Sequence, residues 1–144
     1  MYKHPITYKD FDGKEKTRDF YFNLTEGEIL ELHLSLDGGF DGFISRLQDD
    51  YDPRDVIKVF RSLILKSYGK RTAEGKFIKS DELSEEFAAT GAYSSLFLEL
   101  LENKDNFANT FLERVINVPV GSVQKMIDEN PKLKETEDTF SKDF

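Results

Sequence analysis

Apolar and polar residues alternate along the first part of the chain. Ile6 and Tyr8 fall on one face of an extended segment, and Phe20 and Phe22 fall on one face of a second. The polar stretch between them, DFDGKEK, contains an Asp-Gly pair that is typical of hairpin turns. Because an isolated hairpin is marginally stable in water, it must lie on other elements. The pattern therefore predicts an antiparallel β-hairpin over residues 1–23 that packs on the rest of the chain.

Beyond the hairpin, apolar residues recur every three or four positions, which is the period of amphipathic helices. Thr25 and Glu28 match a capping box, and Asp52 precedes a proline that suits the first helical position. A turn at Glu74-Gly75 allows a second, smaller hairpin. Gly69 is expected to end the most apolar helix, which is predicted to be central. The predicted helices cover residues 25–36, 40–48, 52–68, 81–89, 93–101, 103–117 and 120–127.

These elements predict a mainly α (α+β) fold in one domain over residues 1–129. The N-terminal hairpin would pack on a bundle of about five to seven helices. Residues 130–144 read NPKLKETEDTFSKDF, which is polar and charged with few apolar side chains. Such a composition predicts a flexible, acidic, disordered C-terminal tail.

Composition narrows the functional classes. The 144 residues carry a formal net charge of −8, and such a surface disfavours nucleic acid and membrane partners because it repels phosphate groups. There is no cysteine, so thiolate chemistry and disulfides play no part. No stretch approaches the roughly 20 apolar residues of a membrane span, and the N-terminus does not resemble a signal peptide. We therefore expect a cytosolic protein.

Candidate chemistry is sparse, and the sequence predicts no catalytic residue, cofactor or metal site. His33 lies among apolar positions of a helix, so it is interpreted as a structural histidine. A loose acidic cluster around the second helix has no spacing that fits a calcium loop, and the carboxylates are interpreted mainly as solvated caps. A small enzyme or metal-dependent regulator that uses this cluster stays open as a minor alternative. The cluster consists of Asp37, Asp41, Asp49, Asp50 and Asp52.

Several blocks of the sequence resemble one protein family. In order they are TYKDFDG, TRDFYFNLTEGEILEL, Gly38-Gly39, IKVFRSLILKSYGKR, GKFIKSDELSEEF and TGAYSSLFLEL. Their order and spacing, from about Thr7 to about Phe111, resemble the tail assembly chaperones of long-tailed (siphovirus-type) bacteriophages and prophages. The DFYFNL and ILKSYG segments are the most characteristic, and neither is a catalytic motif.

The resemblance implies a non-enzymatic protein that acts in the host bacterial cytoplasm and is not expected in the mature virion. Its implied client is the tape measure protein, which it would bind and keep soluble during tail morphogenesis. The major tail protein and a frameshifted longer form of this chain are further implied partners, and homo-oligomer formation stays open. The competing reading is a structural tail-completion or connector component that is retained in the virion.

A client-binding role needs exposed apolar side chains. Rings near helix ends or in short helices, and rings in the polar tail, are the candidates, although ordinary core packing is the competing explanation for the first group. The predicted client-binding residues are Phe40, Phe43, Phe87, Tyr93, Phe97, Phe140 and Phe144.

Overall fold

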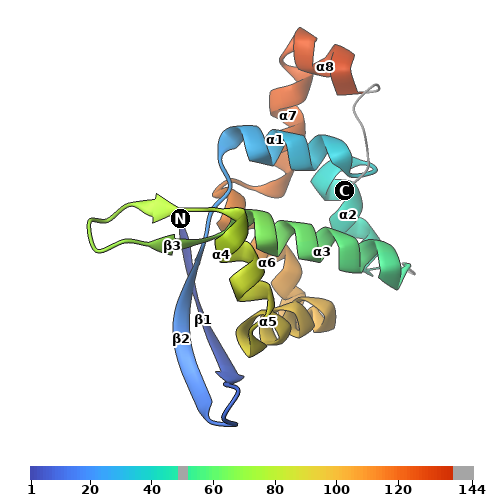
Figure 1. Ribbon diagram of the computed structural model, residues 1–144. Coiled ribbons are helices and arrows are strands. Elements are labelled where there is room, and N and C mark those ends of the chain that lie inside the picture. Colours follow the sequence, from blue (N-terminus) through green and yellow to red (C-terminus); the bar gives the residue numbers. More distant parts are fainter. Residues whose placement is uncertain (49–51, 138–144) are drawn as a thin grey trace.

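The structure is a computed structural model that describes residues 1–48 and 52–137. Within these ranges the fold is α+β, with one four-stranded antiparallel sheet and eight α-helices (Figure 1). The strands are β1 (Tyr2–Lys9), β2 (Glu15–Phe22), β3 (Tyr68–Arg71) and β4 (Phe77–Ile78). The helices are α1 (Glu26–Ser35), α2 (Gly39–Gln48), α3 (Pro53–Ser67), α4 (Asp81–Ala88), α5 (Gly91–Glu102), α6 (Phe107–Ile116), α7 (Val120–Asp128) and α8 (Pro131–Glu137). The predicted fold class is confirmed.

The N-terminal hairpin lies where the sequence predicts it, within residues 1–23. Tyr2 pairs with Phe22 and Lys9 with Glu15, so the two strands match over eight positions each. His4 and Ile6 are buried on the inner face, whereas the alternate residues of β1 are exposed. The inner face packs on α5. This alternation is what a sheet with one solvated face requires.

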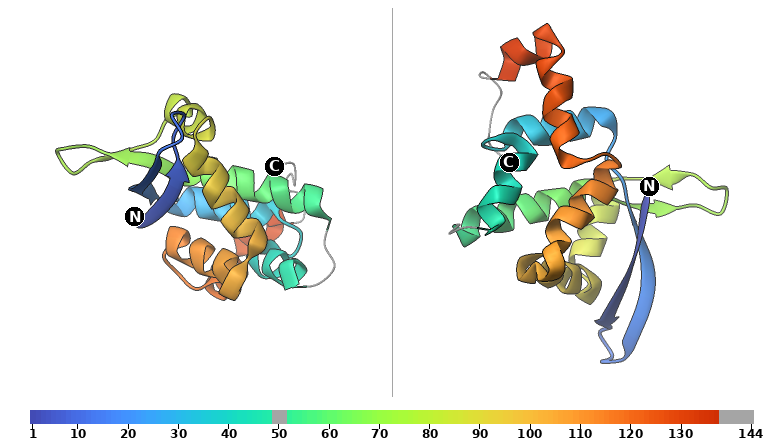
Figure 2. Two further views of the ribbon diagram at one scale, coloured as in Figure 1. Left: turned by 90° about the horizontal axis from the view of Figure 1, so that it is seen from below. Right: turned by 180° about the vertical axis from the view of Figure 1, so that it is seen from behind.

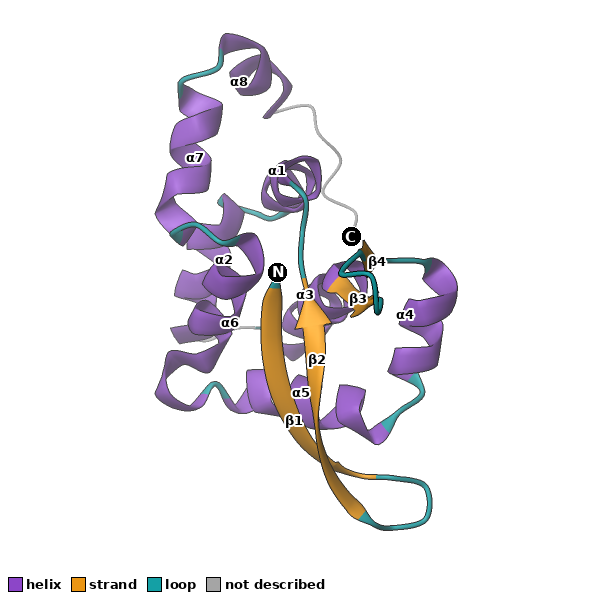
Figure 3. Cartoon of the chain, turned by 90° about the vertical axis from the view of Figure 1, so that its left-hand side faces the viewer, coloured by secondary structure: helices purple, strands orange, loops and turns teal. Residues whose placement is uncertain are grey.

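The sheet opens between its second and third strands. The strand order is β1-β2-β3-β4, but β2 and β3 pair only at Tyr21 with Gly69 and Phe22 with Tyr68. Beyond these two pairs the hairpins diverge: β1–β2 extends past α5, and β3–β4 leads away in another direction (Figures 1 and 3). Over residues 15–20, β2 therefore pairs with β1 on one side, and its other side pairs with no described strand.

Helix α3 supplies a large part of the core. Phe60, Leu63 and Ile64 are buried, while Lys58 and Arg61 are exposed and Ile57, nearer the start of the helix, is 41% exposed, so α3 keeps a solvent face. It contacts α4 and α5. Asp52 caps it by accepting a hydrogen bond from the Arg54 backbone N–H at 3.0 Å, as the sequence predicts.

Helices α1, α2, α7 and α8 form the opposite end of the molecule from the hairpin turn, as the rear view also shows (Figure 2). The predicted capping box is present: the Glu28 backbone N–H donates to Thr25 Oγ1, and the Thr25 backbone N–H donates to Glu28 Oε1.

The His33 side chain, on α1, connects this helix to α2 and α7. Its Nε2–H donates to Gln124 Oε1 at 2.8 Å, and its Nδ1 accepts from the Phe40 backbone N–H at 3.1 Å.

The prediction that Gly69 ends the central helix is wrong. The helix ends at Ser67, whose hydroxyl donates to the Leu63 carbonyl at 2.6 Å, and the chain then becomes extended at Tyr68. Gly69 lies inside β3, where a Cβ atom would stand 2.5 Å from the Ile78 carbonyl oxygen. Glycine is needed here because two strands and a ring approach closely.

Two further boundaries differ from the prediction. The predicted helix over 103–117 is interrupted, since Asn103, Asp105 and Asn106 have positive φ angles of 48°, 54° and 61°. Only α6 remains, preceded by a short 3₁₀ turn. The tail predicted to be disordered contains a helix, α8, over residues 131–137. Asn130 caps this helix, because its Oδ1 accepts from the Lys132 backbone N–H at 3.1 Å. Residues 138–144 lie outside the described part of the chain.

Candidate functional site

The structure places three of the predicted client-binding residues in the core. Phe40, Phe43 and Phe87 are 0%, 3% and 2% exposed. Phe40 packs on the His33 ring, and Phe43 makes an edge-to-face contact with Phe60 at 5.6 Å. These side chains present almost no surface, because α2 and α4 turn their apolar sides inward. Position near a helix end does not make a ring accessible here.

Two other predicted client-binding residues remain partly accessible. Tyr93 and Phe97 are half-buried on α5 and lie next to each other, with ring centroids 5.8 Å apart. Tyr93 also contacts Phe87 at 5.9 Å, so these three residues belong to one continuous group of rings. Phe40 and Phe43 lie in a separate group around α1, α2 and α3. Phe140 and Phe144 lie outside the described residues.

An open groove of about 330 Å³ lies where β2 and β3 separate, and α4 closes its inner side. We call it the aromatic groove. Its rings come from distant parts of the sequence: Tyr8 contacts Phe20 at 6.0 Å, and Phe20 contacts Phe87 at 5.3 Å. The Phe87 ring is stacked on Tyr68. Sequence reasoning identified Phe87 but missed the groove, because the pairing of β2 with β3 is not visible in the local pattern. The lining residues are Tyr8, Arg18, Asp19, Phe20, Tyr21, Tyr68, Gly69, Lys70, Arg71, Glu86, Phe87 and Thr90.

The walls of the groove carry more positive than negative side chains. Arg18, Lys70 and Arg71 line it, against Asp19 and Glu86. Lys70 forms an ion pair with Glu86 at 3.5 Å, whereas Arg18 and Arg71 make no ion pair with any residue in 1–48 or 52–137. Burial, and secondly the Glu86 carboxylate, raise the pKa of the Tyr68 hydroxyl, which stays protonated. The groove is thus a cationic, ring-lined site on an acidic protein, with a formal net charge of −8.

The turn of the N-terminal hairpin, residues 10–14, presents a second candidate feature, which we call the hairpin tip. Phe11 is 89% exposed, the largest value among the exposed large apolar residues of the described chain. Asp10 Oδ1 accepts from the backbone N–H groups of Asp12 and Lys14, both at 2.9 Å. A ring between two aspartates in a polar turn was a visible signal, but sequence reasoning did not select it.

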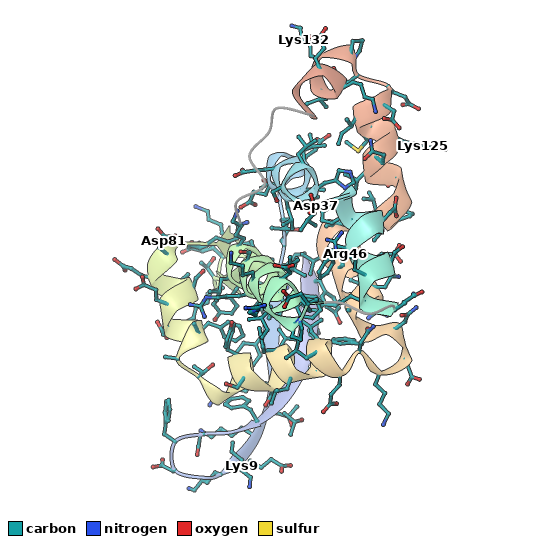
Figure 4. The ribbon with its side chains drawn as sticks, turned by 90° about the vertical axis from the view of Figure 1, so that its right-hand side faces the viewer. Lys9, Asp37, Arg46, Asp81, Lys125 and Lys132 are labelled. Atoms are coloured by element: carbon teal, nitrogen blue, oxygen red, sulfur yellow. The ribbon has the colours of Figure 1, made fainter. Side chains whose placement is uncertain are left out.

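The tip extends beyond the body of the protein. Helix α5 begins against the end of β1, where a Cβ atom on Gly91 would stand 2.6 Å from the Lys9 carbonyl oxygen. Figure 4 shows Lys9 on the arm beyond α5, while Lys132 lies at the far end of the molecule. The five residues after Lys9 therefore project into solvent.

Within the acidic cluster, the Asp52 carboxylate caps α3. The Asp37 backbone carbonyl, just before α2, accepts from Arg46 Nη1 in the last turn of that helix at 2.6 Å. Asp49 and Asp50 lie outside the described residues. Across residues 1–48 and 52–137, no three histidine or carboxylate side chains meet in a group able to hold a metal ion. Nor does any helix in these ranges combine the length and apolar character that crossing a membrane requires.

Comparison with known proteins decides the family. A family described as phage tail assembly chaperone matches residues 1–142, nearly the whole chain. The chain belongs to the phage tail assembly chaperone family. No curated protein and no solved structure matches it. The recognition made from the sequence blocks is therefore confirmed.

Membership gives the chaperone a general role and a general class of partner. The family assembles phage tails, so the partners of this chaperone are phage tail proteins, and a non-enzymatic role is indicated. The aromatic groove and the hairpin tip are then the described features with the character of protein contact sites. Rings that are partly exposed in a polar setting are typical of such sites.

Proposed function

We propose that this chaperone binds the tape measure protein and keeps it soluble in the host bacterial cytoplasm while the tail is built, and that it is left out of the mature virion. The observation that carries the proposal is the aromatic groove on a member of the tail assembly chaperone family. A tape measure protein is a long helical chain with exposed apolar side chains, and such a client needs a partner that covers them.

The groove supports this role by its size and its walls. A volume of about 330 Å³ is at the lower end of ligand pockets, so it suits one or two apolar anchor side chains of a client helix. The half-buried rings of Tyr8 and Phe20 supply contact area at a small entropic cost. Tyr93 and Phe97 continue the ring surface along α5. The groove lies between a sheet and a helix.

The charge of the protein supports the same role. A chaperone that holds an apolar client must keep its complexes from aggregating. The formal net charge of −8 makes complexes repel one another at low ionic strength. The major tail protein and a longer, frameshifted form of the chain are further proposed partners, since both would meet the client at the same stage.

The experiment is co-expression of the tape measure protein with and without this chain, followed by measurement of soluble client. We expect soluble client only when the chaperone is present. Tyr8→Ala and Phe20→Ala should each reduce the soluble fraction several-fold. The matched control is Tyr2→Ala, which removes a half-buried ring from the same hairpin face that contacts Phe111 outside the groove. Urea denaturation of each variant separates loss of binding from loss of folding.

Two results would overturn the proposal. Equal client recovery with and without the chain would contradict the holdase role itself. Stoichiometric amounts of the chain in purified virions, measured by mass spectrometry, would favour the structural tail-completion component instead. Equal effects of the groove and control substitutions would leave the holdase role standing but remove the groove as its site.

A further inference from the structure

The hairpin tip is built as a fixed projection. Asp10 closes the turn through its side chain, and its backbone adds two bonds: the Asp10 N–H donates to the Lys14 carbonyl at 2.9 Å, and the Gly13 N–H donates to the Asp10 carbonyl at 3.0 Å. Lys16 also pairs with Asp10, at 3.1 Å. The Phe11 ring is therefore held in solvent by an ordered turn, so a partner can bind it without first ordering the loop.

Covering an exposed ring of this kind is favourable. Burial of a phenylalanine removes roughly 150–250 Å² from water, and aromatic anchors that fill pockets dominate the energy of protein contacts. Asp10 beside it is paired with Lys16, whereas Asp12 forms no ion pair within residues 1–48 and 52–137, so a pocket that accepts Phe11 should place a cation opposite Asp12. The aromatic groove is such a pocket, since Arg18 and Arg71 line it and form no ion pair within residues 1–48 and 52–137.

The tip cannot reach the groove of its own molecule. Tyr8 lines the near end of the groove, but Phe20 lies five residues beyond Glu15, the first residue of β2, which corresponds to roughly 17 Å of extended chain. The turn itself contains only residues 10–14, and the hairpin pairs along its full length. A second copy of this chain carries the same groove and is present wherever the first copy is, so it is the partner that can receive Phe11.

We propose that the hairpin tip of one molecule inserts Phe11 into the aromatic groove of a second copy, and that the second copy returns the same contact. Two hairpins placed side by side in opposite directions bring each tip to the other groove, because the offset between tip and groove is the same in both molecules. The contact is then isologous and closes as a two-fold dimer. Asp12 faces the arginines of the groove in each half.

The expected contact is small. Two inserted rings and their surroundings give an interface of the weak, transient class, which falls below about 1,200 Å² of total buried area. Such a dimer exchanges quickly, which suits a site that must open for another ligand. If the groove also holds the client, as in the function proposed above, the dimer protects the groove until client is present. The protection of the groove by the dimer depends on the proposed holdase function. Dimer formation itself does not, because it is a property of the isolated chain.

The test measures self-association of the purified full chain without client. Sedimentation equilibrium from about 5 to 500 µM covers the range in which a weak interface dissociates. Phe11→Ser should weaken dimerisation by about tenfold or more, as loss of an anchor does. The matched control is Leu98→Ser, which removes an apolar side chain that is 58% exposed on α5, away from the tip. It should associate like the wild type.

A charge exchange tests the orientation of the contact. Asp12→Arg and Arg71→Asp should each weaken association several-fold, and the chain carrying both changes should recover it, because opposite charges again meet across the interface. A photo-crosslinker at position 11, in a mixture of light and heavy isotope-labelled chains, should join light to heavy peptides of β3 or α4.

Three outcomes would overturn the proposal. They are a monomeric wild type up to 500 µM, unchanged association of Phe11→Ser, or crosslinks from position 11 that join no light chain to a heavy one at β3 or α4. Client recovery in co-expression is not part of these measurements, so failure of the dimer and failure of the holdase role are seen separately.

Discussion

The ring of Tyr68 is stacked on the ring of Phe87, with centroids 4.2 Å apart and planes 6° apart. Tyr68 is the first residue of β3, and Phe87 lies in the last turn of α4. The stack therefore fastens the second hairpin to the helix that follows it. It also forms the floor of the aromatic groove, so one contact serves both the stability of the fold and the shape of the site.

Phe87→Ala should lower the free energy of unfolding by about 3–5 kcal/mol, because it leaves a cavity at a residue that is 2% exposed and contacts several rings. Phe11→Ala should change it by less than about 0.5 kcal/mol, since that ring is 89% exposed. Urea denaturation measures both. A loss below about 1 kcal/mol for Phe87→Ala would mean that the stack is not part of the stable core.

Gly39→Ala should destabilise the end of the molecule formed by α1, α2 and α7. Gly39 has a φ of 67°, and a Cβ atom there would stand 2.2 Å from His33 Cε1. The left-handed backbone costs roughly 1–2 kcal/mol for alanine, and the displaced imidazole adds roughly 1–3 kcal/mol. Gly27→Ala is the control: it lies in α1 with open space around it and should stabilise by about 0.5–1 kcal/mol. Thermal unfolding followed by circular dichroism distinguishes them, and equal melting temperatures would contradict the clash.

Glu28 should make stability depend on acidity. Burial raises the pKa of its carboxyl, but the ion pair with Lys79 and the Thr25 backbone N–H outweigh burial, so the pKa is lowered from its ordinary 4.5. A lowered pKa in the folded state contributes stability above the ordinary value, and this contribution is lost as the pH falls through the folded-state pKa. Glu28→Gln should therefore reduce the fall in stability on acidification below about pH 5.

Denaturant midpoints at several acidities test this dependence. Lys79→Met should reduce the slope in the same way, since it removes the partner of Glu28. Lys58→Met, an exposed lysine on α3, is the control and should keep the wild-type slope. Identical slopes in wild type and Glu28→Gln would show that the ion pair does not contribute.

Removal of residues 138–144 should leave folding intact and reduce client solubility. The last buried apolar residue of the described core is Ile127, so the melting temperature should change little. The proposed contacts of Phe140 and Phe144 with the client would be lost, and Phe140→Ser with Phe144→Ser should reproduce the effect. Full client recovery by the shortened chain would remove both residues from the binding surface.

Local signals predicted much of the fold. The alternation around Ile6 and Tyr8 gave the hairpin, and the caps at Thr25 and Asp52 gave the start of two helices, since these features depend on neighbours within four residues. The signal for α8, an asparagine before a proline, was equally local. It was overridden by the polar composition of the segment, although a cap and a proline at the first helical position are enough to begin a short helix.

The candidate site depends on contacts that no local pattern contains. Phe20 meets Phe87 only because β2 pairs with β3 and α4 folds back over both. Periodicity places a ring on the apolar side of its helix but does not say whether a neighbouring element covers that side. Phe40, Phe43 and Phe87 are buried for this reason, which the periodicity does not show, whereas the exposure of Phe11 needed no long-range information, only attention to a ring in a polar turn.

The hydrogen bond between His33 and Gln124 can form only after the ribosome has made both residues. The two residues are separated by 91 positions, so at about 5–20 residues per second the ribosome needs roughly 5–18 s to make the second after the first. During that interval the α1–α2 end of the nascent chain lacks its third helix. Until α7 leaves the ribosome, the newborn chaperone is itself an incompletely folded polypeptide with apolar surface in need of cover.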